Sequence, residues 1–185
     1  MNRGKSIRYI AGAAGALLLA FLVVLAMAKP GDSESAASPL LGKPAPVVKS
    51  TTLGGGTFDL SYRKGSWVVL NFFNSTCVPC RQEHPLLVDF ANEQESSSNA
   101  VELYTVVNDD SDGPVQAFFD TNGGDWPVVR DDDGAISVAF GIAKVPESWV
   151  IDPNGFVRLR IMGALTKGFL TTRLNELKTQ FAGEQ

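Results

Sequence analysis

The feature that most constrains the fold of this chain is an apolar run, WVVLNFF at Trp67–Phe73, which is followed at once by a polar turn and two cysteines. Such a near-continuous run of β-forming residues is typical of a strand buried on both faces of a sheet. Residues 74–76 (NST) have side chains that cap helices, and the spacing of Leu87 and Phe90 predicts a helix from 77 to about 95. A central strand, a cap and a helix start therefore meet at the cysteines.

The rest of the body alternates strand and helix patterns. Glycines at 54–56 and the turn sequence DPNG at 152–155 each join two extended segments, which predicts two hairpins. Strand patterns are found at 47–48, 57–60, 101–107, 126–130, 148–151 and 156–162, and helical patterns at 115–121, 134–141 and 167–181. Parallel crossovers combined with an antiparallel hairpin predict a three-layer α/β fold.

Charge is distributed unevenly along the chain. Of the 16 Lys and Arg, four lie in the first 29 residues, so the remainder has 12 positive side chains against 20 Asp and Glu, a net charge of −8. Binding of nucleic acid requires a clustered Lys and Arg surface, so the acidic body argues against nucleic acid as a partner.

The N-terminal segment indicates the compartment. Residues 10–28 have no charged side chain, and a helix of this length spans roughly the 30 Å bilayer core. Three cations precede the segment and one follows, which favours a cytoplasmic N-terminus and a body outside the membrane, periplasmic or on the outer face. The predicted organisation is a cytoplasmic N-terminus at 1–9, a transmembrane signal anchor at 10–28, a flexible linker at 29–39 and a folded domain at 40–185. The alternative is signal-peptide cleavage after the AMA sequence at 26–28, although the apolar stretch is longer than the usual roughly 7–15 residues.

The two cysteines are placed for redox chemistry. Cys77 and Cys80 lie three residues apart on the first predicted helical turn, where they can close a small disulfide ring. The helix N-terminus favours a thiolate and lowers a cysteine pKa from about 8.5 to roughly 3.5–7.5. Cys77 is therefore the predicted nucleophile, and Cys80 the resolving cysteine that attacks the mixed disulfide. Pro79 stiffens the ring between them.

Other interpretations of the cysteine pair are weaker. A structural zinc site needs four ligands, and the chain has two Cys and one His. A structural disulfide would close a loop too short to stabilise the fold much. A copper carrier would need a further ligand, which His84 on the same predicted helix could supply. We expect no resident cofactor or metal, with copper binding as the remaining alternative.

Three residues near the second cysteine bear on its chemistry. Glu83 follows Cys80 by three positions and lies on nearly the same face of the helix. A buried Glu83 would have a raised pKa and could accept or return the proton of Cys80. A solvated Glu83 would only interact favourably with the helix dipole. His84 is expected at the surface, and Pro85 is expected to kink the helix.

Two further segments suggest hypotheses about substrate binding and calcium binding. Val145–Pro146 directly precedes a predicted strand, and a cis bond there would present the Val145 backbone to an extended substrate. The residues themselves leave cis and trans open. The acidic run at 131–133 has the composition of a calcium loop but no EF-hand spacing, so it is interpreted as a turn.

The sequences VVLNFFNSTCVPCRQEHPLL at 68–87 and GIAKVPESWVIDPNGFV at 141–157 together resemble the membrane-anchored, thioredoxin-like thiol-disulfide oxidoreductases of the TlpA/ResA/DsbE type, which serve cytochrome c maturation. The resemblance extends over about 40–181. It implies a thioredoxin fold with an N-terminal hairpin and a central insertion around 115–130. It also implies a cis bond at Pro146 opposite Cys77, a kink at Pro85 and a functional acid at Glu83. The family usually has Trp where this chain has Thr76, which alters the substrate face and leaves Thr76 free to cap the helix.

The expected function is that of a membrane-tethered, extracytoplasmic enzyme that reduces the haem-attachment cysteines of apocytochrome c and is recharged by a membrane thiol donor. Thr76, Pro79, Val145 and Pro146 are the expected substrate contacts. Alternatives are a general or copper-site-assembly disulfide reductase, a dithiol oxidant and a non-enzymatic copper-binding module. A thiol peroxidase of the same fold would show the pattern P-x-x-x-T-x-x-C, which is absent before Cys77.

Overall fold

The computed structural model of the protein describes residues 12–21, 23, 34–97 and 99–183. The chain divides into two units, residues 1–31 and 32–185. In the first unit, residues 12–21 are helical. No helix among the described residues has both the length and the apolar character that crossing a bilayer requires. The predicted cytoplasmic terminus at 1–9 and part of the predicted anchor at 10–28 lie outside the described residues.

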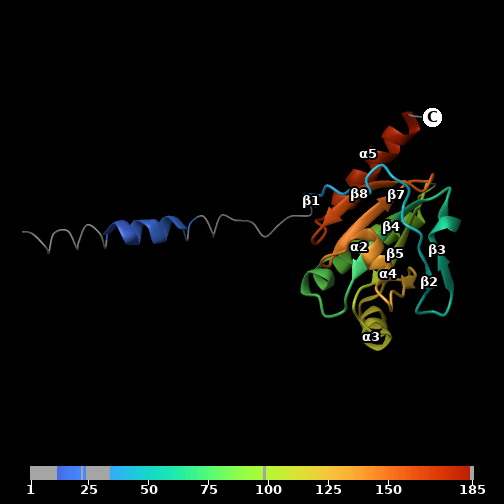
Figure 1. Cartoon of the computed structure of the whole chain (residues 1–185), viewed down its shortest axis with the longest axis horizontal. Coiled ribbons are helices and arrows are strands. Elements are labelled where there is room, and N and C mark those ends of the chain that lie inside the picture. The colour runs from blue at the N-terminus through green and yellow to red at the C-terminus, as the bar shows by residue number, and fades with distance from the viewer. Residues whose placement is uncertain (1–11, 22, 24–33, 98, 184–185) are drawn as a thin grey trace, which may run out of the picture. The chain divides into compact units, whose positions relative to one another are not determined.

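A mixed sheet forms the centre of the second unit (Figure 1). Within the described residues it has six strands in the order β1-β8-β7-β4-β5-β6. The interior strand β4 (Trp67–Phe73) runs parallel to β5 (Val101–Val107) and antiparallel to β7 (Glu147–Ile151). Every residue of β4 is buried, which confirms the predicted central strand. The remaining strands are β1 (Glu34–Ser35), β6 (Val128–Val129) and β8 (Val157–Met162).

The strand β1 falls within the segment that the sequence predicts to be a flexible linker. Glu34 and Ser35 pair antiparallel with Met162 and Ile161 of β8. The Ala36 N–H continues this pairing by donating to the carbonyl of Arg160 at 2.9 Å. Residues 34–36 are therefore part of the sheet edge, while residues 29–33 of the predicted linker lie outside the described residues.

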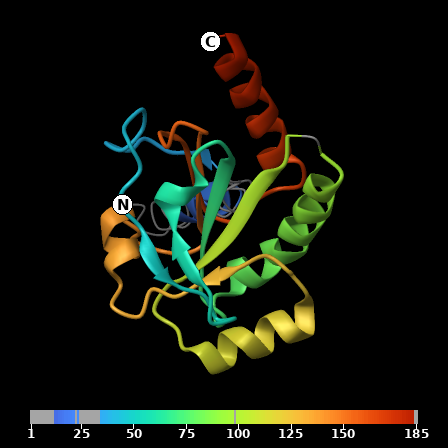
Figure 2. The ribbon, with the colours of Figure 1, turned by 90° about the vertical axis from the view of Figure 1, so that its right-hand side faces the viewer.

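Two layers cover the faces of the sheet, because successive residues of β4 point to opposite sides. Trp67 and Val69 pack with the helices α2 (Val78–Glu95) and α5 (Phe169–Gly183). Leu70 and Phe72 pack on the other face, with α4 (Ala135–Phe140) and with the hairpin of β2 (Lys49–Thr51) and β3 (Thr57–Asp59), which leads into the short helix η1 (Leu60–Arg63). Figure 2 shows α2 and α5 on one side of the sheet and the hairpin and α4 on the other. The predicted layered α/β architecture and the N-terminal hairpin are confirmed.

The helix α3 (Asp112–Asn122) packs where β4 and β5 end. The rings of Phe118 and Phe119 lie 4.9 and 5.7 Å from that of Phe73, the last residue of β4. Cys80 belongs to the same buried cluster. The insertion predicted around 115–130 thus corresponds to α3 and β6, and it lies beside the cysteine pair.

Candidate redox-active site

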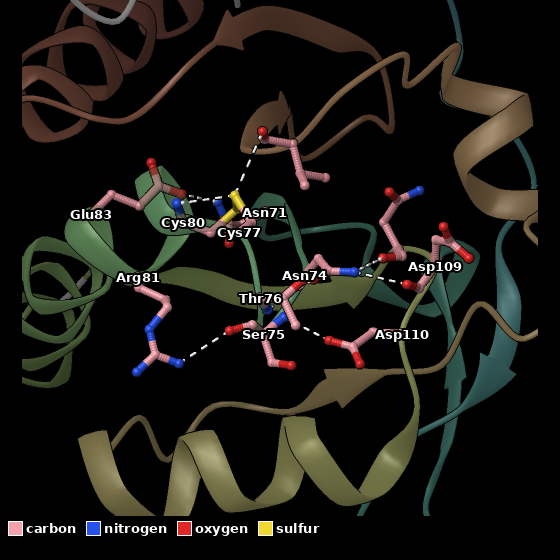
Figure 3. The surroundings of a disulfide bond; sticks show 12 residues. Asn71, Asn74, Ser75, Thr76, Cys77, Cys80, Arg81, Glu83, Asp109 and Asp110 are labelled. Atoms are coloured by element: carbon pink, nitrogen blue, oxygen red, sulfur yellow. Dashed lines mark hydrogen bonds between the residues drawn. A yellow bond between two sulfur atoms is a disulfide. The ribbon is translucent and has the colours of Figure 1, made fainter.

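The two cysteines form a disulfide where β4 leads into α2 (Figure 3). Their sulfur atoms are 2.12 Å apart and their Cα atoms 5.3 Å apart. Cys77 is the N-cap of α2, and its Sγ accepts a hydrogen bond from the Cys80 N–H at 3.2 Å. Cys80 is only 1% exposed, whereas Cys77 is partly exposed. The arrangement leaves one sulfur accessible and buries the other, as the nucleophile and resolving roles require.

The prediction that residues 74–76 cap the helix is wrong, and so is the expectation that Thr76 takes that role. Asn74 instead closes a turn, because its Oδ1 accepts the N–H and the hydroxyl of Thr76 at 2.9 and 2.6 Å. The Asn74 amide donates to the carbonyls of Asn108 and Asp109 at 3.0 and 2.8 Å. Asn74 thereby ties the approach to Cys77 to the loop after β5, a long-range contact that its local sequence does not reveal.

The segment before β7 lies against the exposed cysteine. The Val145–Pro146 bond is cis, as the resemblance implies. The carbonyl oxygen of Val145 is 3.7 Å from the Cys77 Sγ. The carbonyl of Pro146 accepts a hydrogen bond from the Gly163 N–H at 3.1 Å, which fixes the segment from the side of β8. Val145 thus presents backbone next to the sulfur that would meet a substrate, and Pro79 lies exposed in the first turn of α2.

Glu83 is a buried carboxyl with two hydrogen bonds. It is 1% exposed, its Oε1 accepts from the Asn71 amide at 2.8 Å, and its Oε2 accepts from the Leu165 N–H at 2.7 Å. Burial raises the pKa of Glu83 to about 7, while the two hydrogen bonds oppose that rise. The carboxyl can therefore gain and lose a proton near neutral pH, on the helical face that it shares with Cys80.

The sequence analysis missed Asn71, which binds Glu83, and Ser148, which binds Asn71. The Asn71 amide also donates to the Ser148 hydroxyl at 3.1 Å, so β4 and β7 together orient the group that meets Glu83. The signal for Asn71 is visible in the sequence, because it is the one polar residue in the run WVVLNFF. A fully buried amide in a central strand requires partners, and those partners mark the site.

The expectation that His84 lies at the surface is wrong. The side chain is 2% exposed, and its Nε2 lies 2.8 Å from the carbonyl oxygen of Gly123. Burial lowers the pKa of His84. The contact with Gly123 engages one of the two ring nitrogens of the residue that the copper alternative would have used. Among the described residues, no group of three or more His, Cys, Asp or Glu side chains is placed to hold a metal ion.

Two smaller interpretations concern helix ends. Asp131 accepts hydrogen bonds from the N–H groups of Ile136 and Ser137 at 2.8 Å, so it caps α4 within the predicted turn. Pro85 lies inside α2, which continues as a helix to Glu95. The kink expected at Pro85 stays a prediction.

Comparison with known proteins agrees with this geometry. The model of the AhpC/TSA family matches residues 41–160. The thiol:disulfide interchange protein HelX of Rhodobacter capsulatus is 31% identical over 149 residues, which are 79% of this chain and 81% of that protein. The thiol-disulfide oxidoreductase ResA of Bacillus subtilis is 30% identical over 138 residues, 74% of this chain and 75% of that protein.

Solved structures support the fold independently. A thioredoxin-family thiol:disulfide interchange protein from Chlorobium tepidum superposes with a TM-score of 0.61 and 27% identity, over 72% of this chain and 92% of that one. The sheet order, the cysteine pair at the start of α2 and the cis proline opposite it are therefore features of a thioredoxin-like fold.

Proposed function

We infer the function of this chain from the premise that it belongs to the AhpC/TSA family and is a thiol-disulfide oxidoreductase similar to ResA and HelX. We propose that it acts as a reductase on disulfides of extracytoplasmic proteins. The observation that carries the proposal is the pairing of an accessible Cys77 with a buried Cys80 whose helix also bears Glu83. A disulfide that only stabilised the fold would have no need of a buried ionisable carboxyl on the same helical face.

The proposed reaction is a two-step exchange that starts from the dithiol form. The Cys77 thiolate attacks one sulfur of the client disulfide, a mixed disulfide forms, and the other client sulfur leaves as a thiolate. Cys80 then attacks the Cys77 sulfur, and the second client sulfur leaves. Two electrons pass to the client, the client thiolates take up two protons, and the Cys77–Cys80 disulfide is left on the enzyme. The structure corresponds to this oxidised product.

Glu83 has a proton-transfer role in this proposal. Cys80 must lose its proton before it can attack, and it is too buried to release it directly to water. A carboxyl with a pKa of about 7 on the same helical face can accept that proton and return it when the enzyme is reduced again. Asn71 and Leu165 hold the carboxyl in place for both steps.

We propose apocytochrome c, through its haem-attachment cysteines, as the client. This choice is supported by the two sequence segments that resemble cytochrome c maturation enzymes and by the similarity to ResA and HelX. We further propose that residues 10–28 tether the enzyme to the cell membrane with its catalytic domain outside, and that a membrane thiol donor recharges it. The uncharged segment and the cations that precede it support this placement.

The decisive experiment is the reduction potential of the Cys77–Cys80 pair, measured by equilibration in dithiol buffers from about pH 5 to about pH 8, with Glu83→Gln beside the parent. A potential at or below about −220 mV, with a pH dependence that changes in the variant, would support a reductant. A potential near about −120 mV would make the protein an oxidant and overturn the proposal.

A further inference from the structure

A cavity of about 310 Å³ lies where β4 begins, whereas the cysteines follow where β4 ends. The seven residues of β4 therefore separate the cavity from the disulfide by roughly 20 Å, at about 3.3 Å per residue. Three segments form its walls: residues 44–47, the helix η1 with the residue that follows it, and the turn between β7 and β8. The proposed redox reaction uses none of these segments.

Backbone hydrogen bonds hold the three walls together. Each of three bonds joins a different pair of walls: the Ala45 N–H to the Gly155 carbonyl at 2.8 Å, the Gly65 N–H to the Pro153 carbonyl at 2.8 Å, and the Leu60 N–H to the Val48 carbonyl at 3.0 Å. Asp152 also fixes the turn, because its Oδ1 accepts from the N–H groups of Asn154 and Phe156 at 2.9 Å. The cavity is therefore preformed in the folded protein, as small-molecule sites usually are.

Apolar side chains make up most of the inner surface of this cavity. Leu60, Val68 and Ile151 are buried beneath it. Two further lining residues stay in contact with solvent, since Val47 is 80% exposed and Phe156 is 36% exposed. A bound apolar group would remove this surface from water, which is favourable. The volume equals that of about ten water molecules and suits a body of about ten non-hydrogen atoms.

The charges around the cavity favour an anion. Four ionisable side chains line it, and three have an ion-pair partner: Asp59 with Lys49 at 3.1 Å, Arg63 with Glu102 at 3.5 Å, and Asp152 with Arg158 at 2.6 Å. The fourth is Lys64, whose ammonium has no hydrogen bond or ion pair within the described part of the chain. Its aliphatic stem lies along the turn, because a Cβ on Gly155 would be 3.3 Å from the Lys64 Cε. One uncompensated positive charge therefore lies beside an apolar cavity.

We propose that this cavity binds a small amphipathic monoanion, a carboxylate with an aliphatic or aromatic body of about ten non-hydrogen atoms. The body lies against Val68 and Ile151, and the carboxylate pairs with the ammonium of Lys64. A neutral molecule of the same shape gains the apolar contacts alone, and a cation is repelled by Lys64. The site neither uses the cysteines nor depends on the reaction proposed for them.

The test titrates the full-length protein, in detergent micelles, with three probes that share one body and differ in the charge of the head group: phenylbutyrate, phenylbutyramide and phenylbutylamine. The methyl groups of Val68 and Ile151, followed by NMR, report binding in the cavity and not in the micelle. We expect saturable shifts with phenylbutyrate and a dissociation constant of roughly 0.1–1 mM. The amide should bind about three- to fivefold more weakly, and the amine more weakly still.

Three variants test the role of charge. Lys64→Gln removes the cation and should bring the affinity for phenylbutyrate down to that for the amide, which should not change. Val47→Asp places a negative charge on a side chain that is 80% exposed, so the fold should tolerate it, and the amine should then bind more tightly than the carboxylate. Lys167→Gln removes an exposed lysine outside the cavity and should behave like the parent.

Several outcomes would overturn the proposal. Equal affinities for the three probes, or a preference for the carboxylate that survives in Lys64→Gln, would remove the role of charge. Shifts that grow linearly with every probe would indicate partition into the micelle. Shifts that depend on protein concentration without a probe would mean that a second copy covers the cavity. The reduction potential should stay at the parent value in all three variants, so the proposed function is tested separately.

Discussion

At the scale of single residues, the site contains the buried carboxyl of Glu83. The free-energy cost of burying its charged form is only partly offset by its hydrogen bonds with Leu165 and Asn71. The ordinary pKa of Glu83 is 4.5, and burial raises it to about 7 against two opposing hydrogen bonds. A group that is easier to protonate in the folded chain than in the unfolded one makes folding depend on pH. Glu83 thus links the stability of the fold to the proton transfer that we propose for the reaction.

The first prediction concerns this pH dependence. Because the folded-state pKa is raised, the contribution of Glu83 to stability is fully present below pH 4.5 and is lost as pH rises through about 7. The free energy of unfolding of the oxidised protein should therefore fall, relative to that of Glu83→Gln, by roughly 3 kcal/mol across this window. Urea unfolding at several pH values measures it, with Glu95→Gln at the exposed end of the same helix as the control. Parallel curves for the parent and Glu83→Gln would contradict the assignment.

The second prediction tests the support of Glu83 by Asn71. The Asn71 amide favours the charged carboxylate, so Asn71→Leu should raise the pKa of Glu83 further, by roughly one unit. A ¹³C titration of the Glu83 carboxyl by NMR measures the change. Ser148→Ala is the matched control, because it removes the other acceptor of the same amide without touching Glu83. If Ser148→Ala shifts the titration as far as Asn71→Leu, the direct hydrogen bond is not the cause.

At the scale of elements, the geometry of α3 depends on the turn that ends it. Gly124 has a φ of 108°, where side chains are strained, and a Cβ there would press on Trp126 and Phe119. Gly113, in the first turn of the same helix, has open space around its Cβ position and a φ outside that range. A side chain at position 124, in the turn after α3, would therefore be strained, whereas one at position 113, inside α3, would not.

The third prediction follows from this contrast. Gly124→Ala should destabilise the protein by about 1–3 kcal/mol through backbone strain and the displaced rings. Gly113→Ala should leave stability unchanged or raise it by about 0.5 kcal/mol, since alanine suits a helix better than glycine does. Chemical unfolding of both variants at one pH measures the pair. Similar losses of stability at the two positions would mean that the effect comes from helix α3 as a whole and not from its closing turn.

The elements also show what could be predicted from the sequence and what could not. The strand β4 was predictable, because burial on both faces requires an apolar run. The helix cap was not, since Asn74 bonds to the loop after β5 and leaves the cap to the sulfur of Cys77. The burial of His84 was equally hidden, because the rings that enclose it come from α3 and Trp126, more than thirty residues away. Local patterns predict elements, while the partners of polar side chains depend on tertiary contacts.

At the scale of the whole molecule, the sheet brings four distant segments to one place. The β4–α2 junction supplies the cysteines and Glu83, and the start of β7 supplies the cis proline. The segment between β8 and α5 holds both, because the Gly163 N–H bonds to Pro146 and the Leu165 N–H bonds to Glu83. The α3 insertion adds Phe118 and Phe119, which belong to the same buried cluster as Cys80. The accessible sulfur of Cys77 therefore lies where these four segments converge.

The last prediction uses this division between an accessible and a buried sulfur. In the full-length chain, Cys80→Ser should trap the client as a mixed disulfide on Cys77, because the group that resolves the adduct is missing. Cys77→Ser should trap almost none, since Cys80 is 1% exposed and its sulfur is out of reach of a polypeptide. Non-reducing gels of the reduced variants mixed with a disulfide-bonded Cys-x-x-Cys-His polypeptide measure the adducts, and we expect at least about tenfold more with Cys80→Ser than with the parent. Comparable adducts on the two single variants would mean that either sulfur can attack, and the order of steps proposed for this enzyme would be wrong.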